Sequence, residues 1–253
     1  MYRFNKVKVW LRKLIERARI TRRMLQLNKK KHQPLGSADW LAKAELECGG
    51  YQHNIARNAV SHLDPRGHDE LTTGGMIGGD RMVHHDYASV YEKYLAPFVG
   101  GVSPKVVLEC GILKGTGLAV WSKLFPEAQI VGLDIDVEHT RANLEFLKSR
   151  GAFKNSDPEL LIFDQFKPSV EELRERLNGE TLDIVIDDGF HSEETIVNTI
   201  NALRPFLSSD FVYFVEDNSS IFKKIIDLFP ESHVYSHGEM TVVTTFRNDA
   251  HGQ

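Results

Sequence analysis

Short apolar runs and helical segments alternate along the chain from Lys105 onward. Each apolar run has the length of a buried strand, and a segment with a helical pattern follows each one. The predicted strands are Val106 to Glu109, Gln129 to Asp134, Leu160 to Phe163, Leu182 to Asp187 and Phe211 to Glu216, and the predicted helices are Gly117 to Phe125, Glu138 to Ser149, Ser169 to Asn178 and Ser192 to Leu207. This alternation predicts an α/β fold with a doubly wound, mostly parallel sheet.

The pattern changes at the C-terminal end. A helix from Ser219 to Leu228 precedes two β-rich runs, His233 to Tyr235 and Met240 to Phe246, which only four residues separate. A connection this short predicts a hairpin, so the seven-stranded sheet should finish with an antiparallel strand. We therefore predict one domain over residues 101–247, with residues 248–253 as a tail.

Residues 36–100 are predicted to form a helical cap with a lid. Ser37 is placed to cap a helix that runs through Glu47, and a second helix should cover Ala88 to Phe98. Between them, the loop from Leu71 to Asp80 holds four glycines, which indicate tight backbone geometry or close approach to a ligand. The segment that follows, Arg81 to Tyr87, contains two adjacent histidines. Adjacent side chains rarely aim at one ion, so we interpret this segment as part of a polar lid over a neighbouring site.

The first 31 residues are strongly basic, unlike the rest of the chain. They hold 12 Lys and Arg and a single acidic residue, for a net charge of +11, whereas the remaining residues carry 19 basic and 34 acidic side chains, a net charge of −15. Apolar residues recur in this segment at helical spacing, which predicts a basic amphipathic helix within an N-terminal extension, residues 1–35. Such a helix can lie on an anionic membrane surface. The alternative is an arm that packs on the acidic remainder of the chain or on a second subunit of a homo-oligomer.

The composition sets further limits. With 42% apolar and 26% charged residues among 253, the chain is an ordinary globular protein. Its two cysteines, Cys48 and Cys110, cannot form a disulfide framework, which favours a reducing compartment. There is no apolar stretch of the roughly 20 residues that span a bilayer, no signal-peptide pattern and no nucleic-acid-binding module. We expect a cytoplasmic protein without a nucleic-acid partner, with any membrane contact peripheral, at the inner face, through residues 1–31.

Two acidic clusters each follow directly on a predicted buried strand. Asp187-Asp188-Gly189-Phe190-His191 follows Leu182 to Ile186, and Glu216-Asp217 follows Phe211 to Val215. If these strands are neighbours in a parallel sheet, their carboxyl ends bring several carboxylates and one imidazole to the crevice where such sheets bind ligands. Clustered acids repel one another, and a cation relieves the repulsion. Carboxylate oxygens suit Mg²⁺, Ca²⁺ or Mn²⁺. The alternative is turn chemistry alone, with Asp187 or His191 starting the next helix.

A glycine-rich turn follows the first predicted strand. Gly111, Gly115 and Gly117 stand at this strand-to-helix junction, where glycine lets a nucleotide-like ligand approach the backbone. Asp134 ends the second strand, about where such folds place the acid that binds a ribose, roughly 20 residues after the glycines. Together they favour an adenosyl ligand.

With these residues in place, the chain resembles the class I S-adenosylmethionine-dependent methyltransferases, whose Rossmann-like sheet ends in the same antiparallel hairpin. It is most similar to the metal-dependent sugar O-methyltransferases of the mycinamicin and macrocin type, from about Gly79 to Phe246. The motifs that carry the resemblance are Asp80 with His85-x-Tyr87-x-x-Val90-Tyr91-Glu92, Leu108-Glu109-x-Gly111 with Trp121, Gly132-Leu133-Asp134-Ile135-Asp136, Phe163-Asp164-Gln165, Asp187-Asp188-Gly189-Phe190-His191 and Val215-Glu216-Asp217.

The resemblance implies a role for each matched residue. Glu109, Gly111 and Gly115 would line the methionine end of S-adenosylmethionine, Asp134 would hold the ribose, and Asp164 with Gln165 would lie near the adenine. Asp188, Glu216 and Asp217 would bind Mg²⁺, His191 would be the general base, and Asp187 would be structural. Leu113 departs from the family's Gly-x-Gly-x-Gly turn, because it stands where the middle glycine is expected.

The expected function is Mg²⁺-dependent O-methylation of a sugar hydroxyl in a glycan, a glycolipid or a glycosylated natural product. A sugar hydroxyl is a poor nucleophile, so a bound cation that lowers its pKa and a histidine that accepts its proton meet the needs of the reaction. Two alternatives stay open: a metal-dependent hydroxylase on the same fold, for which one histidine is fewer than the usual two, and a non-catalytic binding module.

Overall fold

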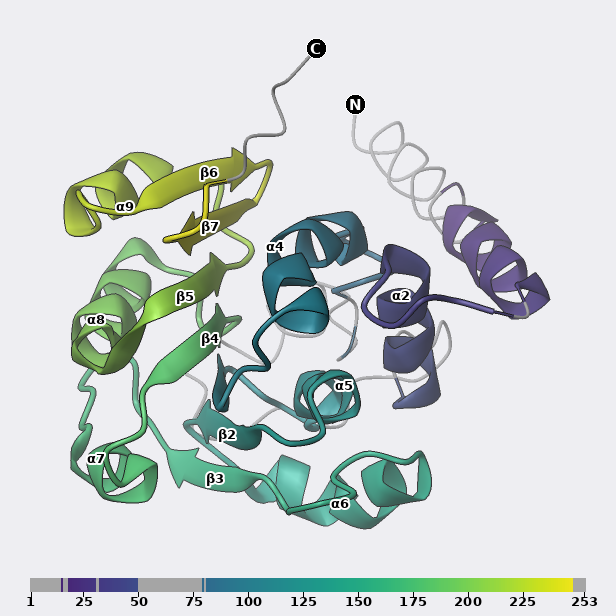
Figure 1. Ribbon diagram of the computed structural model, residues 1–253, viewed down its shortest axis with the longest axis horizontal. Coiled ribbons are helices and arrows are strands. Elements are labelled where there is room, and N and C mark those ends of the chain that lie inside the picture. Colours follow the sequence, from purple (N-terminus) through teal and green to yellow (C-terminus); the bar gives the residue numbers. More distant parts are fainter. Residues whose placement is uncertain (1–14, 16–17, 31, 50–78, 80, 248–253) are drawn as a thin grey trace, which may run out of the picture.

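The fold is an α/β domain built on one seven-stranded sheet, with helices on both of its faces (Figure 1). This computed structural model describes residues 15, 18–30, 32–49, 79 and 81–247. The strand order is β3-β2-β1-β4-β5-β7-β6, with parallel pairing from β3 through β5 and antiparallel pairing of β7 with β5 and β6. The predicted doubly wound sheet with a C-terminal antiparallel hairpin is confirmed, and this strand order is that of the methyltransferase Rossmann-like fold.

The elements occur along the chain in the expected alternation. The strands are β1 (Val106–Cys110), β2 (Gln129–Asp134), β3 (Glu159–Ile162), β4 (Leu182–Asp187), β5 (Leu207–Val215), β6 (His233–His237) and β7 (Met240–Thr244). The helices are α2 (Ala38–Glu47), α4 (Ala88–Gly100), α5 (Thr116–Leu124), α6 (Glu138–Ser149), α7 (Glu171–Leu177), α8 (Glu193–Leu203) and α9 (Phe222–Leu228), with a 3₁₀ turn, η1, at Arg204–Phe206.

Each face of the sheet has its own apolar core. Successive residues of a strand point to opposite faces, so Val107 and Ile184 belong to one core while Val106 and Val185 belong to the other. Helices α4, α5 and α6 lie on one side of the sheet, and α7, α8 and α9 lie on the other (Figure 1). Because both faces are covered, the central strands are largely apolar, and this explains why they appear in the sequence as apolar runs.

The described part of the basic N-terminal segment packs on the domain. Residues 18–29 are helical, and two of their apolar side chains, Ile20 and Leu27, are fully buried. Arg23 forms an ion pair with Asp39 of α2 at 2.8 Å. Arg19 donates a hydrogen bond of 2.6 Å to the carbonyl oxygen of His84. These contacts agree with the expectation of an arm that packs on the acidic remainder of the chain.

Other predictions for the N-terminal third lie outside the described residues. These are the part of the predicted amphipathic helix that falls in residues 1–14, most of the loop from Leu71 to Asp80, and Asp80 itself. The predicted cap of α2 is confirmed, because the Ser37 hydroxyl accepts a hydrogen bond from the Trp40 amide. Among the helices that the structure describes, none has the length and apolar character needed to cross a membrane.

The boundaries differ most at β5. The sequence pattern predicts a helix through Leu207 and a strand from Phe211, but α8 ends at Leu203 and β5 begins at Leu207. Pro205 ends the α-helix within the short 3₁₀ turn. The first residues of β5 include Ser208 and Asp210, and their polar character hides the strand from a search for apolar runs.

Two backbone turns approach closely at the carboxyl ends of β1 and β4. The Asp188 amide donates to the carbonyl oxygen of Cys110 at 2.9 Å, and Gly111 follows with a φ of +84°. A Cβ atom at Gly111 would lie 2.1 Å from the carbonyl oxygen of Asp188. A side chain therefore cannot be placed here without moving the backbone that carries the acidic cluster.

This packing predicts the effect of substituting Gly111. We expect Gly111→Ala to lower the free energy of unfolding by about 2 to 4 kcal/mol, because it combines backbone strain with steric overlap. Gly179→Ala is a matched control, since Gly179 has a φ of +90° but a Cβ atom there would have no neighbouring atom within 4 Å. Urea unfolding of both variants measures the difference. An equal loss in the two variants would show that the close approach contributes nothing.

Candidate active site

The two acidic clusters meet at one edge of the sheet. β4 and β5 are parallel neighbours, with Asp187 opposite Val215, so Asp188 and Glu216 leave the sheet side by side. Helix α8 is capped by Ser192, whose hydroxyl accepts a hydrogen bond from the Thr195 amide at 3.1 Å. Neither Asp187 nor His191 is the N-cap of this helix, so the alternative in which one of them starts the helix is wrong.

Asp188, His191 and Asp217 form a compact cluster at this edge. Each offers one ligand atom, and the three atoms lie within 4.8 Å of one another. His191 Nε2 is 3.9 Å from Asp188 Oδ1. His191 and Asp217 both have left-handed backbone conformations, with φ values of +65° and +56°. Residues other than glycine rarely adopt this conformation, and it is concentrated at functional sites.

The donor set of this cluster fits a divalent cation. Asp188 and Asp217 offer carboxylate oxygens, the donors that Mg²⁺ prefers, and His191 stands beside them. Two carboxylates with a third acid, Glu216, beside them also leave negative charge that a cation would neutralise. The residues present therefore fit the Mg²⁺ that the sequence resemblance implies.

Glu216 is held by other groups. Its side chain is 2% exposed, and its two oxygens lie 2.7 and 3.0 Å from Arg81 Nε. The Tyr91 hydroxyl also donates to Glu216. The carboxylate thus already accepts hydrogen bonds from Arg81 and Tyr91, and its role as a metal ligand stays a prediction.

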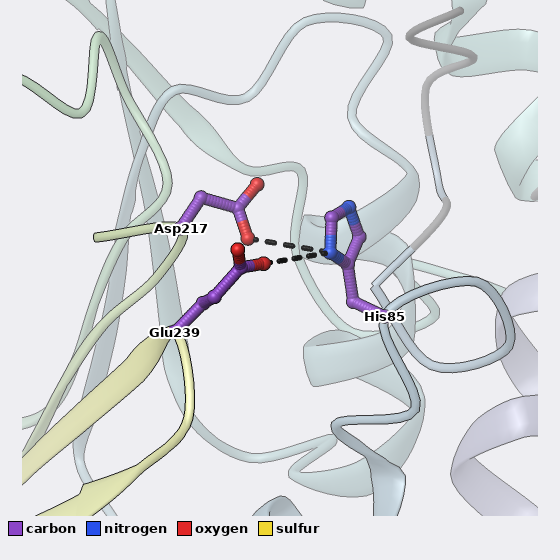
Figure 2. A group of neighbouring side chains, drawn as sticks. All are labelled: His85, Asp217 and Glu239. Atoms are coloured by element: carbon purple, nitrogen blue, oxygen red, sulfur yellow. Dashed lines mark ion pairs between the residues drawn. The ribbon is translucent and has the colours of Figure 1, made fainter. Parts of the chain in front are cut away.

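Asp217 also contacts the segment before α4, and Figure 2 shows the ion pairs of His85 with Asp217 and with Glu239. The Tyr87 hydroxyl donates to Asp217 Oδ1 at 2.7 Å. His85 Nδ1 lies 3.5 Å from the same oxygen and 4.0 Å from a Glu239 oxygen, and the His85 ring stacks on Tyr87. His85 and His191 therefore approach Asp217 in two separate groups of possible ligands.

Three residues of the site were not predicted as site residues from the sequence. Arg81, His85 and Tyr87 come from the segment that was interpreted as a lid, and all three contact acids at the strand ends. The concentration of cationic, imidazole and phenol groups in a short segment before α4 is the signal that could have pointed to them.

Glu109 stands near the end of β1 and shares Arg81 with Asp188 and Glu216. Its side chain is 3% exposed and accepts hydrogen bonds from Trp121 Nε1 at 2.6 Å and from Arg81 Nη2 at 2.9 Å. Burial raises the pKa of Glu109, and the charge of Arg81 opposes this rise. A Cβ atom at Gly117 would lie 2.2 Å from a Glu109 oxygen, so this glycine of α5 makes room for the ion pair.

Asp134 contacts the turn that follows β1. Its Oδ2 atom accepts hydrogen bonds from the amides of Ile112 and Leu113 at 2.9 and 3.1 Å. Gly111 and Gly115 both have positive φ values, and Leu113 between them has a φ of +44°. The leucine thus adopts a conformation that favours glycine, which gives a physical reason for a glycine at this position in related turns. The proposed contact of Asp134 with a ribose stays a prediction.

Gln165 is bonded inside the domain. Its amide nitrogen donates to Asp187 Oδ1 at 2.9 Å and to the Thr199 hydroxyl at 2.7 Å, and its oxygen accepts from the Phe190 amide at 2.8 Å. The neighbouring Asp164 accepts a hydrogen bond from the Phe166 amide. Gln165 therefore holds the turn after β4, and the predicted position of both residues near an adenine is not tested by these contacts.

Asp187 points into the domain rather than toward the cluster. Its side chain is buried, and burial raises its pKa to about 7. Its Oδ2 atom has no hydrogen-bond partner among the residues that the structure describes. This environment agrees with the structural role that the sequence resemblance implies.

The strand order and the cluster of acids at the carboxyl ends of β4 and β5 define the protein as a methyltransferase-like α/β domain with a candidate cation site. Comparison with known proteins points the same way. No protein-family model matches the chain. A curated relative, the 8-demethyl-8-alpha-L-rhamnosyl tetracenomycin-C 2'-O-methyltransferase of Streptomyces olivaceus, is 27% identical over 148 residues, which are 55% of this chain and 35% of the relative.

Solved structures of methyltransferases are also similar. The MycE methyltransferase of the mycinamycin biosynthetic pathway, in complex with Mg and SAH, is 22% identical with a TM-score of 0.48, over 66% of this chain and 51% of that one. A putative O-methyltransferase from Klebsiella pneumoniae is 14% identical with a TM-score of 0.49, over 87% of this chain and 94% of that one. The strand order, rather than these superpositions, carries the fold assignment. The matches to the tetracenomycin enzyme and to MycE cover only about a third and a half of those proteins. The predicted resemblance to sugar O-methyltransferases is confirmed.

The environment of Asp187 predicts a pH dependence of stability. Its pKa is about 7 in the folded chain and near 3.8 when exposed. Between about pH 4 and 7 the Asp187 carboxyl is therefore protonated in the folded protein and ionised in the unfolded chain. As a result, Asp187 makes the free energy of unfolding fall as the pH rises through this range. We expect Asp187→Asn to remove that component and to stabilise the protein above pH 7 by about 2 to 4 kcal/mol.

The measurement is urea unfolding between pH 5 and 8 in the presence of a chelator, so that no cation contributes. Asp210→Asn is the control, because Asp210 is an exposed acid on β5. If Asp187→Asn and the unaltered protein show the same pH profile, the carboxyl of Asp187 is ionised in the folded protein.

Proposed function

We propose that the protein is an S-adenosylmethionine- and Mg²⁺-dependent O-methyltransferase that acts on a sugar hydroxyl of a glycan, a glycolipid or a glycosylated natural product. The observation that carries the proposal is the Asp188, His191 and Asp217 cluster, which lies at the same sheet edge as the glycine turn after β1. This arrangement would place a bound cation next to a turn suited to an adenosyl ligand, as methyl transfer to a hydroxyl requires.

The sugar acceptor is supported by the relatives. The tetracenomycin relative is named for 2'-O-methylation of a rhamnosyl compound. A MycE structure is described in complex with Mg, SAH and mycinamycin VI. These names concern those proteins, and they favour a glycosylated small molecule as the first acceptor class to test with this one.

In the proposed mechanism, Asp188, Asp217 and Glu216 would hold the cation, which would lower the pKa of the acceptor hydroxyl. His191 accepts the hydroxyl proton at Nε2, the atom that faces Asp188. The bound cofactor would supply an activated methyl group to the acceptor oxygen, with its sulfur as the leaving group. The hydrogen bond from the Asn218 side-chain amide to the His191 carbonyl, 2.9 Å, fixes the backbone that carries the imidazole.

Glu109, Asp134 and the turn glycines form the proposed cofactor side. Glu109 is suited to the ammonium of the methionine end, because it is a buried carboxylate beside the turn. Gly111 and Gly115 have positive φ values where the turn between β1 and α5 bends. Asp164 and Gln165 complete the proposed set near the adenine.

A hydroxylase has less support than a methyltransferase. Non-haem iron oxygenases use two histidines and one carboxylate on one ion. In the part of the chain that the structure describes, His85 and His191 belong to different ligand groups, so no single group holds both. A binding module without catalysis is tested by calorimetry with S-adenosylmethionine, with and without Mg²⁺, since absence of binding in both cases would favour it.

The role of His191 predicts a specific kinetic effect. We expect His191→Ala to lower kcat by about 10² to 10⁴-fold, because the acceptor keeps its proton, while the affinity for S-adenosylhomocysteine stays within about twofold. In the assay, the protein is incubated with labelled cofactor and with glycosylated acceptors or cell extracts. Mass spectrometry then detects the gain of one methyl group. His233→Ala is the control, since His233 lies at the start of β6, away from the cluster. Full activity of His191→Ala would remove His191 as the base.

The role of Asp188 predicts an effect on cation binding that needs no acceptor. We expect Asp188→Asn to weaken Mn²⁺ binding by about tenfold or more in calorimetry, because the neutral amide is a poorer ligand than a carboxylate. Asp210→Asn again controls for the loss of one acid. Unchanged cation affinity would take Asp188 out of the ligand set.

A further inference from the structure

Arg81 is the residue that joins the two halves of the proposed site. It precedes α4 in sequence, and its side chain is 6% exposed. Its Nη2 atom donates to Glu109 Oε1 at 2.9 Å and to Asp188 Oδ2 at 2.7 Å, and its Nε atom faces both oxygens of Glu216. One guanidinium thus contacts acids from the ends of β1, β4 and β5.

The surroundings of Arg81 hold the guanidinium in one place. Its Cζ atom lies 5.6 Å from the centre of the Trp121 ring and 6.0 Å from that of Tyr91. Trp121 also donates to Glu109, and Tyr91 donates to Glu216, so the carboxylates are fixed from their other sides. The planar guanidinium of arginine presents several N–H donors and also stacks on aromatic rings. The ammonium group of lysine does neither in this way.

The contacts also decide which oxygen of Asp188 is available. Arg81 bonds Oδ2, whereas Oδ1 faces His191 Nε2 at 3.9 Å. The bond to Arg81 therefore turns Asp188 so that Oδ1 belongs to the cluster with His191 and Asp217. In the same way, Arg81 and Trp121 together fix both oxygens of Glu109.

We propose that Arg81 is a positioning residue that orients both the cation ligands and the acid at the cofactor end, so that neither part of the pocket is organised without it. This inference rests on the proposed function for the identity of the two ligands. Its consequence is that loss of Arg81 weakens the binding of a divalent cation and of S-adenosylhomocysteine, each measured without the other.

The test uses Arg81→Lys and Arg81→Met in the full chain. Mn²⁺ binding is measured by calorimetry without cofactor, and S-adenosylhomocysteine binding is measured in a chelator. We expect both affinities to fall about tenfold or more in both variants. The loss in Arg81→Lys would show that the fork geometry matters as well as the charge. Arg141→Met is the control, because Arg141 is an exposed arginine of α6 that pairs with Glu138.

A double-mutant cycle separates positioning from a general structural role. If Arg81 acts on the cofactor end through Glu109, Arg81→Met should change S-adenosylhomocysteine affinity by less than about threefold in a Glu109→Gln background, while its effect on Mn²⁺ persists. Circular dichroism and thermal unfolding check the fold of each variant. If Arg81→Met does not fold, Arg81→Lys, which keeps the charge, carries the test.

The outcomes distinguish this inference from the proposed function. If the unaltered protein binds both probes and the Arg81 variants bind them equally well, the positioning role is overturned and the proposed function stands. A loss of only one affinity also overturns it, because the coupling of the two halves is then absent. If the unaltered protein binds neither probe, the proposed function fails first and the inference fails with it.

Discussion

A buried guanidinium shared by three carboxylates is the interaction on which the pocket depends. Glu109, Asp188 and Glu216 come from three different strand ends, and like charges this close repel one another in a poorly solvated site. Arg81 offsets part of that repulsion and supplies directed donors to all three. Formally, one positive charge faces three negative ones, so the site retains an excess of negative charge that favours cationic ligands. Both a divalent metal ion and a sulfonium cofactor match this requirement.

The backbone around this ion network leaves no spare volume. A Cβ atom at Gly111 would meet the Asp188 backbone, one at Gly117 would meet the Glu109 carboxylate, and one at Gly189 would lie 2.1 Å from the Gln165 side chain. These glycines stand in the motifs that suggested a nucleotide-like ligand and a metal site, but their immediate neighbours are parts of the protein. Close packing of the strand-end turns against one another is thus sufficient reason for glycine at each position, independently of any ligand.

Two groups of side chains serve different purposes in the proposed chemistry. Asp188, His191 and Asp217 lie together at the carboxyl edge of the sheet, while Asp187 and Gln165 are bonded beneath them in the domain. The outer group offers ligand atoms and a proton acceptor, and the inner group holds the turn that carries them. Left-handed backbone at His191 and Asp217 is maintained only because the surrounding structure fixes it, as the hydrogen bond from Asn218 to the His191 carbonyl illustrates.

The sequence by itself determined the order of strands and helices along the chain and the parallel sheet, because strands buried on both faces appear as apolar runs. It also determined the placement of acids after β4 and β5, because residues that follow parallel strands emerge at the carboxyl edge of the sheet. It could not determine side-chain orientation. Arg81, His85 and Tyr87 reach acids 28 to 154 positions away in the chain, and Glu216 turns toward Arg81 and Tyr91. Only the tertiary structure decided these contacts, because they depend on how α4 and the preceding segment pack across the sheet, and no local spacing encodes that packing.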